Sequence, residues 1–154
     1  MPVPPDKDDQ TPSRRRQARL RGSGTGTTTF GSEFQYAILR VVPRLERGEQ
    51  INAGVVLFAR QAGFLAALVR LDAERLLAIA PEVDAAPLAR QLDAIARVAA
   101  GDADAGPIAS LPQSERFAWI VAPSSTAIQA SAVHVGLCDD PRAKLERLFA
   151  ELVA

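Results

Sequence analysis

The chain has 154 residues, of which 47% are hydrophobic and 23% are charged, as expected for one globular domain with room for a tail. Its 18 basic residues balance 18 acidic ones, so the chain lacks the overall positive charge of a dedicated nucleic-acid-binding protein. One cysteine and one histidine exclude an internal disulfide and cysteine-rich or histidine-pair zinc sites, and we expect no metal ion and no cofactor.

Residues 1–33 are predicted to form a disordered tail. They contain few large hydrophobic side chains, so ordering them would release too little free energy to offset the lost entropy. The run GSGTGTTT lacks the Gly-Lys-Ser/Thr ending of a phosphate-binding loop, which favours a flexible linker. The tail could still contact nucleic-acid phosphates weakly through its arginines: Arg14, Arg15, Arg16, Arg19 and Arg21.

We expect a soluble, cytoplasmic protein without membrane contact. The arginine cluster is similar to a twin-arginine export signal, but no apolar segment of about 7 to 15 residues follows it. No run approaches the roughly 18 uninterrupted apolar residues of a membrane helix. The lone Cys138 suits a reducing compartment.

Residues 34–154 are predicted to form a single domain that begins with three strands. The segments 34–42, 51–59 and 64–70 read FQYAILRVV, INAGVVLFA and FLAALVR, and all are dense in aromatic and branched residues. Because the connections RLERGEQ and RQAG are short, consecutive strands should pair antiparallel. The simplest topology is a three-stranded meander.

Two helices are predicted to follow, each beginning at an aspartate. Asp72 and Asp84 are favourable N-caps, and both are flanked by hydrophobic residues at the spacing of a hydrophobic staple. Pro81 should end the first helix, and Gly101 should end the second.

The last third of the chain predicts two more strands and a final helix. The apolar run FAWIVA (117–122) indicates a fourth strand, and the alternation around Val133 indicates a fifth. Asp140 and Pro141 are a favoured start for a helix whose apolar stripe should pack on the sheet. The predicted fold class is therefore α+β, with an antiparallel sheet of about five strands and about three helices on one face.

Polar residues interrupt the first predicted hairpin. In simple strand alternation Asn52 and Gly54 share a face with Val56, so the asparagine needs hydrogen-bond partners. Arg40 interrupts the preceding strand, and a register that places it opposite Gly54 would give its side chain room beside Asn52. One hypothesis is a polar cluster of Arg40, Glu49 and Asn52, with Gly54 clearing space for the cluster or for a ligand. The alternative is a solvated Glu49, an asparagine that bonds the backbone, and a bulge at Gly54.

His134 is the only histidine and the only candidate base of a serine triad. Residue counts alone allow His134 to act with a serine and an aspartate of the C-terminal region. No Gly-x-Ser-x-Gly nucleophile motif occurs, which favours a half-buried strand histidine instead. The candidate partners are Ser124, Ser125, Ser131, Asp139 and Asp140.

Two blocks of the chain resemble a bacterial family called domain of unknown function 3037. The blocks are YAILRVVPRLERGEQINAGVVLF and PSSTAIQASAVHVGLCDDP, and the similarity extends over about residues 34–153. The first carries the family hallmark Gly-Glu-x-x-Asn-x-Gly, preceded by Arg-x-x-Pro. The resemblance implies a bacterial cytosolic protein, brings no activity, and points weakly to a HipA-like kinase as partner. The hallmark and second-block residues that we take as candidate binding residues are Arg40, Gly48, Glu49, Asn52, Gly54, Gln129 and His134.

Three hypotheses about function follow. The first is a non-enzymatic accessory or protein-binding domain, partnered with a HipA-like kinase of a toxin–antitoxin or stress system. The second is a small hydrolase or nuclease that uses Glu49, Asn52 and Arg40, with or without His134. The third is nucleic-acid binding through the arginine-rich tail.

Overall fold

The computed structural model describes residues 31–124 and 126–154. The predicted tail therefore lies outside the described residues, apart from its last three positions. Ser32 and Glu33, which we assigned to the tail, belong to the first strand. The folded domain thus begins two residues earlier than predicted.

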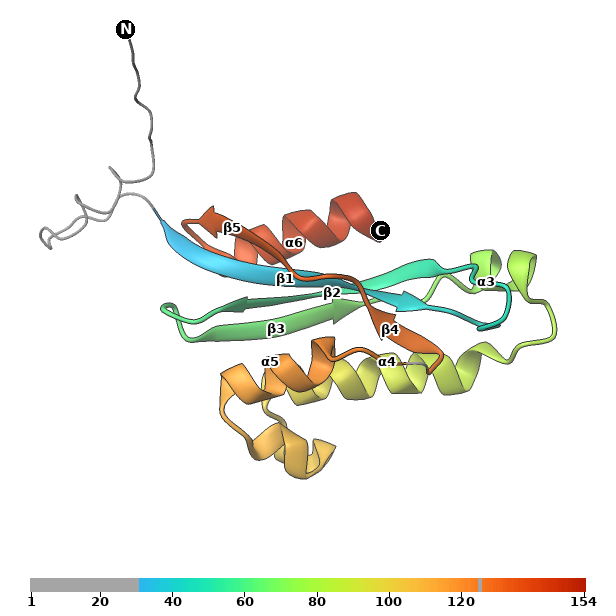
Figure 1. Cartoon of the computed structure of the whole chain (residues 1–154), viewed down its shortest axis with the longest axis horizontal. Helices are drawn as coiled ribbons and strands as arrows, with labels where there is room; N and C mark the ends of the chain where they lie inside the picture. The colour runs from blue at the N-terminus through green and yellow to red at the C-terminus, as the bar shows by residue number, and fades with distance from the viewer. Residues whose placement is uncertain (1–30, 125) are drawn as a thin grey trace, which may run out of the picture. The chain divides into compact units, whose positions relative to one another are not determined.

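The domain is built on a five-stranded antiparallel sheet (Figure 1). Three strands form the predicted meander: β1 (Ser32–Val41), β2 (Ile51–Ala59) and β3 (Phe64–Val69). The other two, β4 (Ile128–Ala130) and β5 (His134–Cys138), pair with successive parts of β1 on its second side. The predicted α+β class and five-stranded antiparallel sheet are confirmed.

In the described part of the chain, four helices accompany the sheet: α3 (Ala73–Ile79), α4 (Ala85–Ala100), α5 (Gln113–Val121) and α6 (Pro141–Leu152). Two short 3-10 turns, η2 (Ala103–Ala105) and η3 (Pro107–Ser110), connect α4 to α5. The predicted aspartate caps are confirmed, because each side chain accepts hydrogen bonds from N–H groups of its helix's first turn. Gly101 ends α4 in the left-handed conformation, as predicted.

The prediction of a strand at residues 117–122 is wrong, because residues 117–121 lie in α5 and Ala122 is its C-cap. Phe117 and Ile120 are buried three positions apart, whereas Trp119 between them is 49% exposed. A spacing of three places both buried side chains on one helical face. Short apolar runs do not distinguish a buried strand from a helix, which explains the error.

The second edge of the sheet is interrupted at Ser131, between β4 and β5. Ile38 donates its backbone N–H to the Ser131 hydroxyl at 2.8 Å and accepts the Ser131 N–H at 2.8 Å. The hydroxyl therefore takes the place of a main-chain carbonyl in the ladder. The predicted fifth strand exists, but it begins at His134 and is preceded by the short β4.

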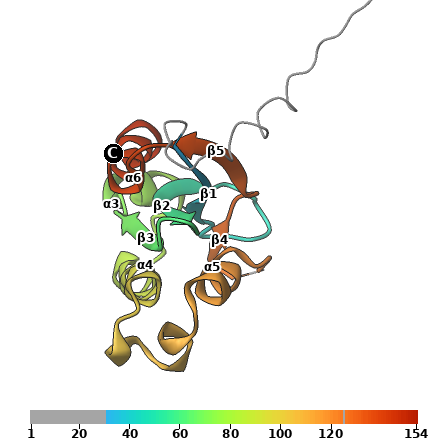
Figure 2. The same ribbon diagram turned by 90° about the vertical axis from the view of Figure 1, so that its left-hand side faces the viewer.

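The helices cover both faces of the sheet, so the prediction of helices on one face is corrected. Helices α4 and α5 lie on one side and α6 on the other (Figures 1 and 2). The reason lies in β2, where four consecutive side chains are at most 3% exposed and alternate between the two faces. The four are Val55, Val56, Leu57 and Phe58.

A β-bulge in β2 reverses the predicted alternation of its first residues. Leu39 pairs with Gly54 but Arg40 pairs with Asn52, so Ala53 is an extra residue. As a result, Asn52 lies on the α6 face instead of sharing a face with Val56. Arg40 is therefore opposite Asn52 and not opposite Gly54, which corrects the predicted register.

Candidate functional site

Gly48 and Glu49 form the turn that leads into β2. Gly48 has a φ of 73°, a left-handed conformation that a residue without Cβ adopts easily. Arg47 donates two hydrogen bonds to the Glu49 carboxylate, at 2.9 and 3.0 Å. These bonds hold the pKa of Glu49 below its ordinary value. Both oxygens of the Glu49 carboxylate are thus engaged by Arg47.

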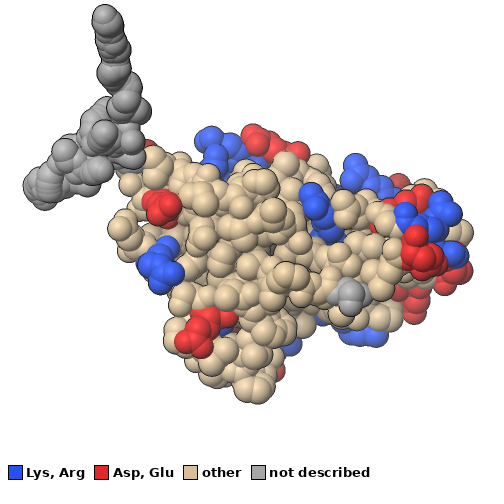
Figure 3. Space-filling model, viewed as in Figure 1, with Lys and Arg blue, Asp and Glu red and all other residues tan. Residues whose placement is uncertain are grey.

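The turn belongs to a network of charges of both signs at one end of the sheet (Figure 3). Arg44 pairs with Glu82 and lies 4.0 Å from Glu46. Glu49 also borders a surface hollow with Asn52 and Arg75 of α3. Because Arg47 already holds Glu49 and Asp72 lies 3.6 Å from Arg75, the charged groups of this hollow are paired within the protein.

Asn52 connects the sheet to the end of α6. Its side-chain N–H donates to the Leu152 carbonyl at 3.1 Å, and its carbonyl oxygen accepts from Arg40 Nε at 3.4 Å. The last carbonyls of a helix lack partners within the helix, so Asn52 satisfies one that α6 leaves open. Both polar ends of this half-buried amide are therefore engaged inside the protein.

The two sequence blocks meet at Arg40. Gln129 of β4 is opposite Arg40 in the sheet, and Arg40 is opposite Asn52, so the three side chains form a polar row across three strands. Gln129 also donates to the Thr126 carbonyl at 2.9 Å. The predicted pairing of Arg40 with Asn52 is present, but Gln129 and not Glu49 is the third member of the row.

Gly54 makes room for the neighbouring strand. A Cβ at this position would lie 2.8 Å from the Leu68 carbonyl oxygen, closer than real Cβ atoms come, and a tight 3.0 Å from Val69 Cγ1. The glycine therefore permits close approach of β3 beside the bulge. This geometry favours the bulge interpretation over a glycine that clears space for a ligand.

His134 lies far from the Glu49 turn. It begins β5 opposite Tyr36, is exposed, and stacks on the Tyr36 ring with centroids 5.1 Å apart. Tyr36 precedes Arg40 by four residues on β1, a distance of about 13 Å along a strand. Glu49 follows beyond the same end of β1, so the geometry argues against one catalytic centre that contains both Glu49 and His134.

Three of the candidate triad partners have structural roles, and Asp139 is exposed. The Ser131 hydroxyl bonds the backbone of Ile38, and the Ser124 hydroxyl lies 2.8 Å from that of Thr126. Asp140 caps α6, and Ser125 lies outside the described residues. Within residues 31–124 and 126–154, no three His, Cys, Asp or Glu side chains are grouped to hold a metal ion.

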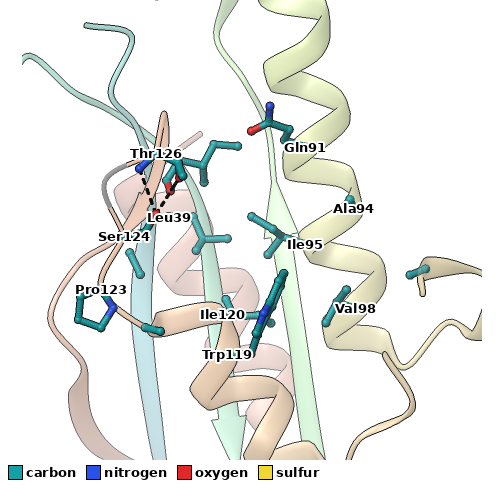
Figure 4. Close-up of a pocket in the computed structure, with 14 residues that line it drawn as sticks. Leu39, Gln91, Ala94, Ile95, Val98, Trp119, Ile120, Pro123, Ser124 and Thr126 are labelled. Atoms are coloured by element: carbon teal, nitrogen blue, oxygen red, sulfur yellow. Dashed lines mark hydrogen bonds between the residues drawn. The ribbon is translucent and has the colours of Figure 1, made fainter. Parts of the chain in front are cut away.

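A groove that the sequence did not predict lies between α4, α5 and the β4 edge (Figure 4). Its volume is about 520 Å³, within the usual range for ligand sites. Leu39 and Ile128 line it from the sheet, and Ile95 lines it from α4. None of its lining residues is charged; the others are Gln91, Ala94, Val98, Ala105, Trp119, Ile120, Ala122, Pro123, Ser124, Thr126 and Ala130.

Trp119 is the most prominent side chain of this groove. It is the only tryptophan of the chain and is 49% exposed, because α5 directs its neighbours Phe117 and Ile120 into the core. The polar groups of Gln91 and Thr126 lie toward the opposite end of the groove (Figure 4). The sequence signal for this groove was a tryptophan between two apolar residues at helical spacing, Phe117 and Ile120. Because we predicted a strand here, this signal was not recognised.

The chain was compared with known proteins. The family model described as "Protein of unknown function (DUF3037)" matches residues 36–153. Searches of curated proteins and of solved structures gave no match. Within the described part of the chain, no helix is both long enough and apolar enough to cross a membrane. The family match covers most of the chain, including both blocks that meet at Arg40, and the chain therefore belongs to this family of unknown function.

Proposed function

We propose that this protein is a non-enzymatic binding domain, and that the α4–α5 groove holds an apolar segment of a partner protein. The observation that carries the proposal is the uncharged lining of the groove together with the half-exposed Trp119. An exposed tryptophan beside an apolar hollow is typical of binding surfaces, where tryptophan often contributes much of the affinity.

The hallmark residues support this assignment because they stabilise the fold. Arg47 engages Glu49, the Leu152 carbonyl engages Asn52, and the backbone of β3 packs against Gly54. A catalytic group needs a free polar atom that faces a substrate. These residues thus explain a family hallmark without requiring a reaction.

The chemistry of the groove defines the kind of segment it would bind. Because no lining residue is charged, a charged segment would lose hydration without gaining an ion pair. An amphipathic helix that presents two or three apolar side chains would match a groove between two helices. Gln91 supplies a hydrogen-bonding group at one end of such a segment, whereas the Thr126 hydroxyl is engaged by Ser124 and the Ile128 carbonyl.

A HipA-like kinase is the specific partner that we propose. This choice rests on the family resemblance, and the groove supports only the broader idea of an apolar protein segment. Calorimetric titration of the full chain with a purified HipA-like kinase tests both the specific partner and the groove as the contact surface. Replacing Trp119 by Ala should weaken binding about 30-fold, which corresponds to roughly 2 kcal/mol at an interface hot spot.

The matched control is Leu77→Ala on α3. Leu77 is 60% exposed and does not line the groove, so its removal should leave the affinity within about twofold. Equal affinity of the Trp119→Ala variant would contradict the groove as the contact surface. If the kinase does not bind at all, the specific partner is refuted. The groove can then be examined alone by following the emission of the sole tryptophan on addition of Nile red, an uncharged apolar dye.

A further inference from the structure

The outer edge of β5 is a second surface suited to association. Among the described residues, β1 is the strand that pairs with β5, so the opposite edge of β5 presents backbone N–H and C=O groups without a strand partner. Edge strands are usually protected by lysines, prolines or bulges. The sequence of β5, HVGLC, contains none of these.

Three of the exposed side chains in and directly before β5 are apolar, whereas His134, also exposed, is polar and lies on the other side of the strand. Val135 and Leu137 are 61% and 66% exposed and lie on the same side of β5, and Val133, directly before the strand, is 37% exposed. On the other side, the Phe34 ring packs against Gly136, where an added Cβ would lie 2.8 Å from it. At Gly136 one face of β5 is therefore packed within the domain, and the face that carries Val135 and Leu137 is exposed.

We propose that β5 pairs with β5 of a second copy of this chain, antiparallel and centred on Val135. In this register Val135 faces its own equivalent, and Val133 of each copy faces Leu137 of the other. The pairing is self-complementary, as a two-fold dimer requires, and it extends one residue before β5 so that Val133, Val135 and Leu137 each gain an apolar neighbour. The two sheets become one continuous sheet.

The size of the contact predicts a weak dimer. A stable dimer buries about 800 Å² on each partner, whereas a five-residue strand and three apolar side chains provide less. We therefore expect a dissociation constant of about 10 to 1000 μM, at the weak end of specific association. This inference is independent of the groove, since Trp119 lies on α5 and does not contribute to the β5 edge.

Sedimentation equilibrium of the full chain over micromolar to millimolar concentrations tests the proposal. Val135→Lys places two ammonium groups opposite each other across the axis and should raise the dissociation constant at least about tenfold. Leu77→Lys is the matched control because Leu77 is 60% exposed on α3, and it should leave the dimer unchanged. A monomer at every concentration, or equal effects of the two lysines, would overturn the proposal. A dimer lost in Trp119→Glu but retained in Val135→Lys would place the contact in the groove instead.

Cysteine cross-linking tests the register without relying on a charged substitution. In a Cys138→Ser background, Val135→Cys should form an intermolecular disulfide on mild oxidation, because residues opposite each other lie about 4.5 to 5.5 Å apart between Cα atoms. Leu137→Cys should not, since its two copies would lie about 14 Å apart along the strands. Cross-linking of neither variant, or of both equally, contradicts the proposed pairing.

Discussion

Replacement of Asn52 by Ala separates a structural role from a binding role for this residue. The substitution removes the hydrogen bond to the Leu152 carbonyl at 3.1 Å and the longer one from Arg40 at 3.4 Å. A hydrogen bond contributes about 1 kcal/mol net, and an unsatisfied half-buried partner adds to the loss. The bond from Arg40 contributes less to the unfolding free energy because it is long. The expected loss of unfolding free energy is therefore about 1.5 to 2.5 kcal/mol.

Urea denaturation measures this loss directly. The midpoint should fall while the slope of free energy against urea stays constant, because the substitution does not change the surface exposed on unfolding. For a domain of this size the melting temperature should fall by roughly 5 to 12 °C. Gln129→Ala is the matched control, since this amide bonds only the Thr126 carbonyl nearby and should cost less than about 1 kcal/mol.

A double-mutant cycle isolates the contact between Arg40 and Asn52. With a separation of 3.4 Å we expect a coupling of only about 0.5 kcal/mol, so most of the Asn52 effect should persist in an Arg40→Ala background. The reasoning is refuted if Asn52→Ala leaves stability within about 0.5 kcal/mol of the original protein but abolishes partner binding. That result would make Asn52 a binding residue.

Three further predictions concern Gly54, Glu49 and Cys138. Gly54→Ala should destabilise the domain by about 2 to 4 kcal/mol in thermal melts, because the added Cβ would meet the Leu68 carbonyl oxygen. The control Gly48→Ala has open space around the added Cβ and only a left-handed φ to strain, so it should cost about 1 kcal/mol. Equal costs of the two substitutions would contradict this account. The hydrogen bonds from Arg47 lower the pKa of Glu49 in the folded protein. The ion pair therefore stabilises the fold fully at pH values above the unfolded pKa, near 4.5, and this stabilisation is lost as the pH falls through the lower folded pKa. Glu49→Gln should therefore be less stable than the original protein at pH 7, and the difference should disappear at low pH; a difference that persists there would argue against the ion pair. Burial raises the pKa of the Cys138 thiol, so iodoacetamide should alkylate it at pH 8 more slowly than free cysteine, and a faster reaction would contradict the burial.

Local chemistry determined much of the secondary structure before any tertiary contact was considered. The aspartate at each helix start satisfies N–H groups within its own first turn, so Asp72, Asp84 and Asp140 act as caps wherever the helix packs. Short loops between β-rich segments similarly required an antiparallel meander. These features depend on neighbours within a few residues, which explains why the sequence predicted them.

Tertiary structure decided the features that depend on residues far apart in the chain. Whether residues 117–122 form a strand or a helix depended on what Phe117 could pack against, and it packs on Phe58 with ring centroids 5.3 Å apart. The bulge at Ala53 depended on the pairing of β1 with β2, and it moved Asn52 to the α6 face. No local pattern encodes a one-residue register shift, although such a shift reverses every side chain beyond it.

The candidate sites also combine features that the local sequence determines with features that only long-range contacts determine. From the sequence alone, the polar interruption of the hairpin by Arg40 and Asn52 could be identified. Their arrangement required the sheet, because Gln129 joins them from a strand nearly ninety residues along the chain, whereas His134 of the same block pairs with the far part of β1. The groove formed only when the helix α5 placed Trp119 beside α4. Residue types determine what a segment can contact, and only long-range packing determines which contacts it makes.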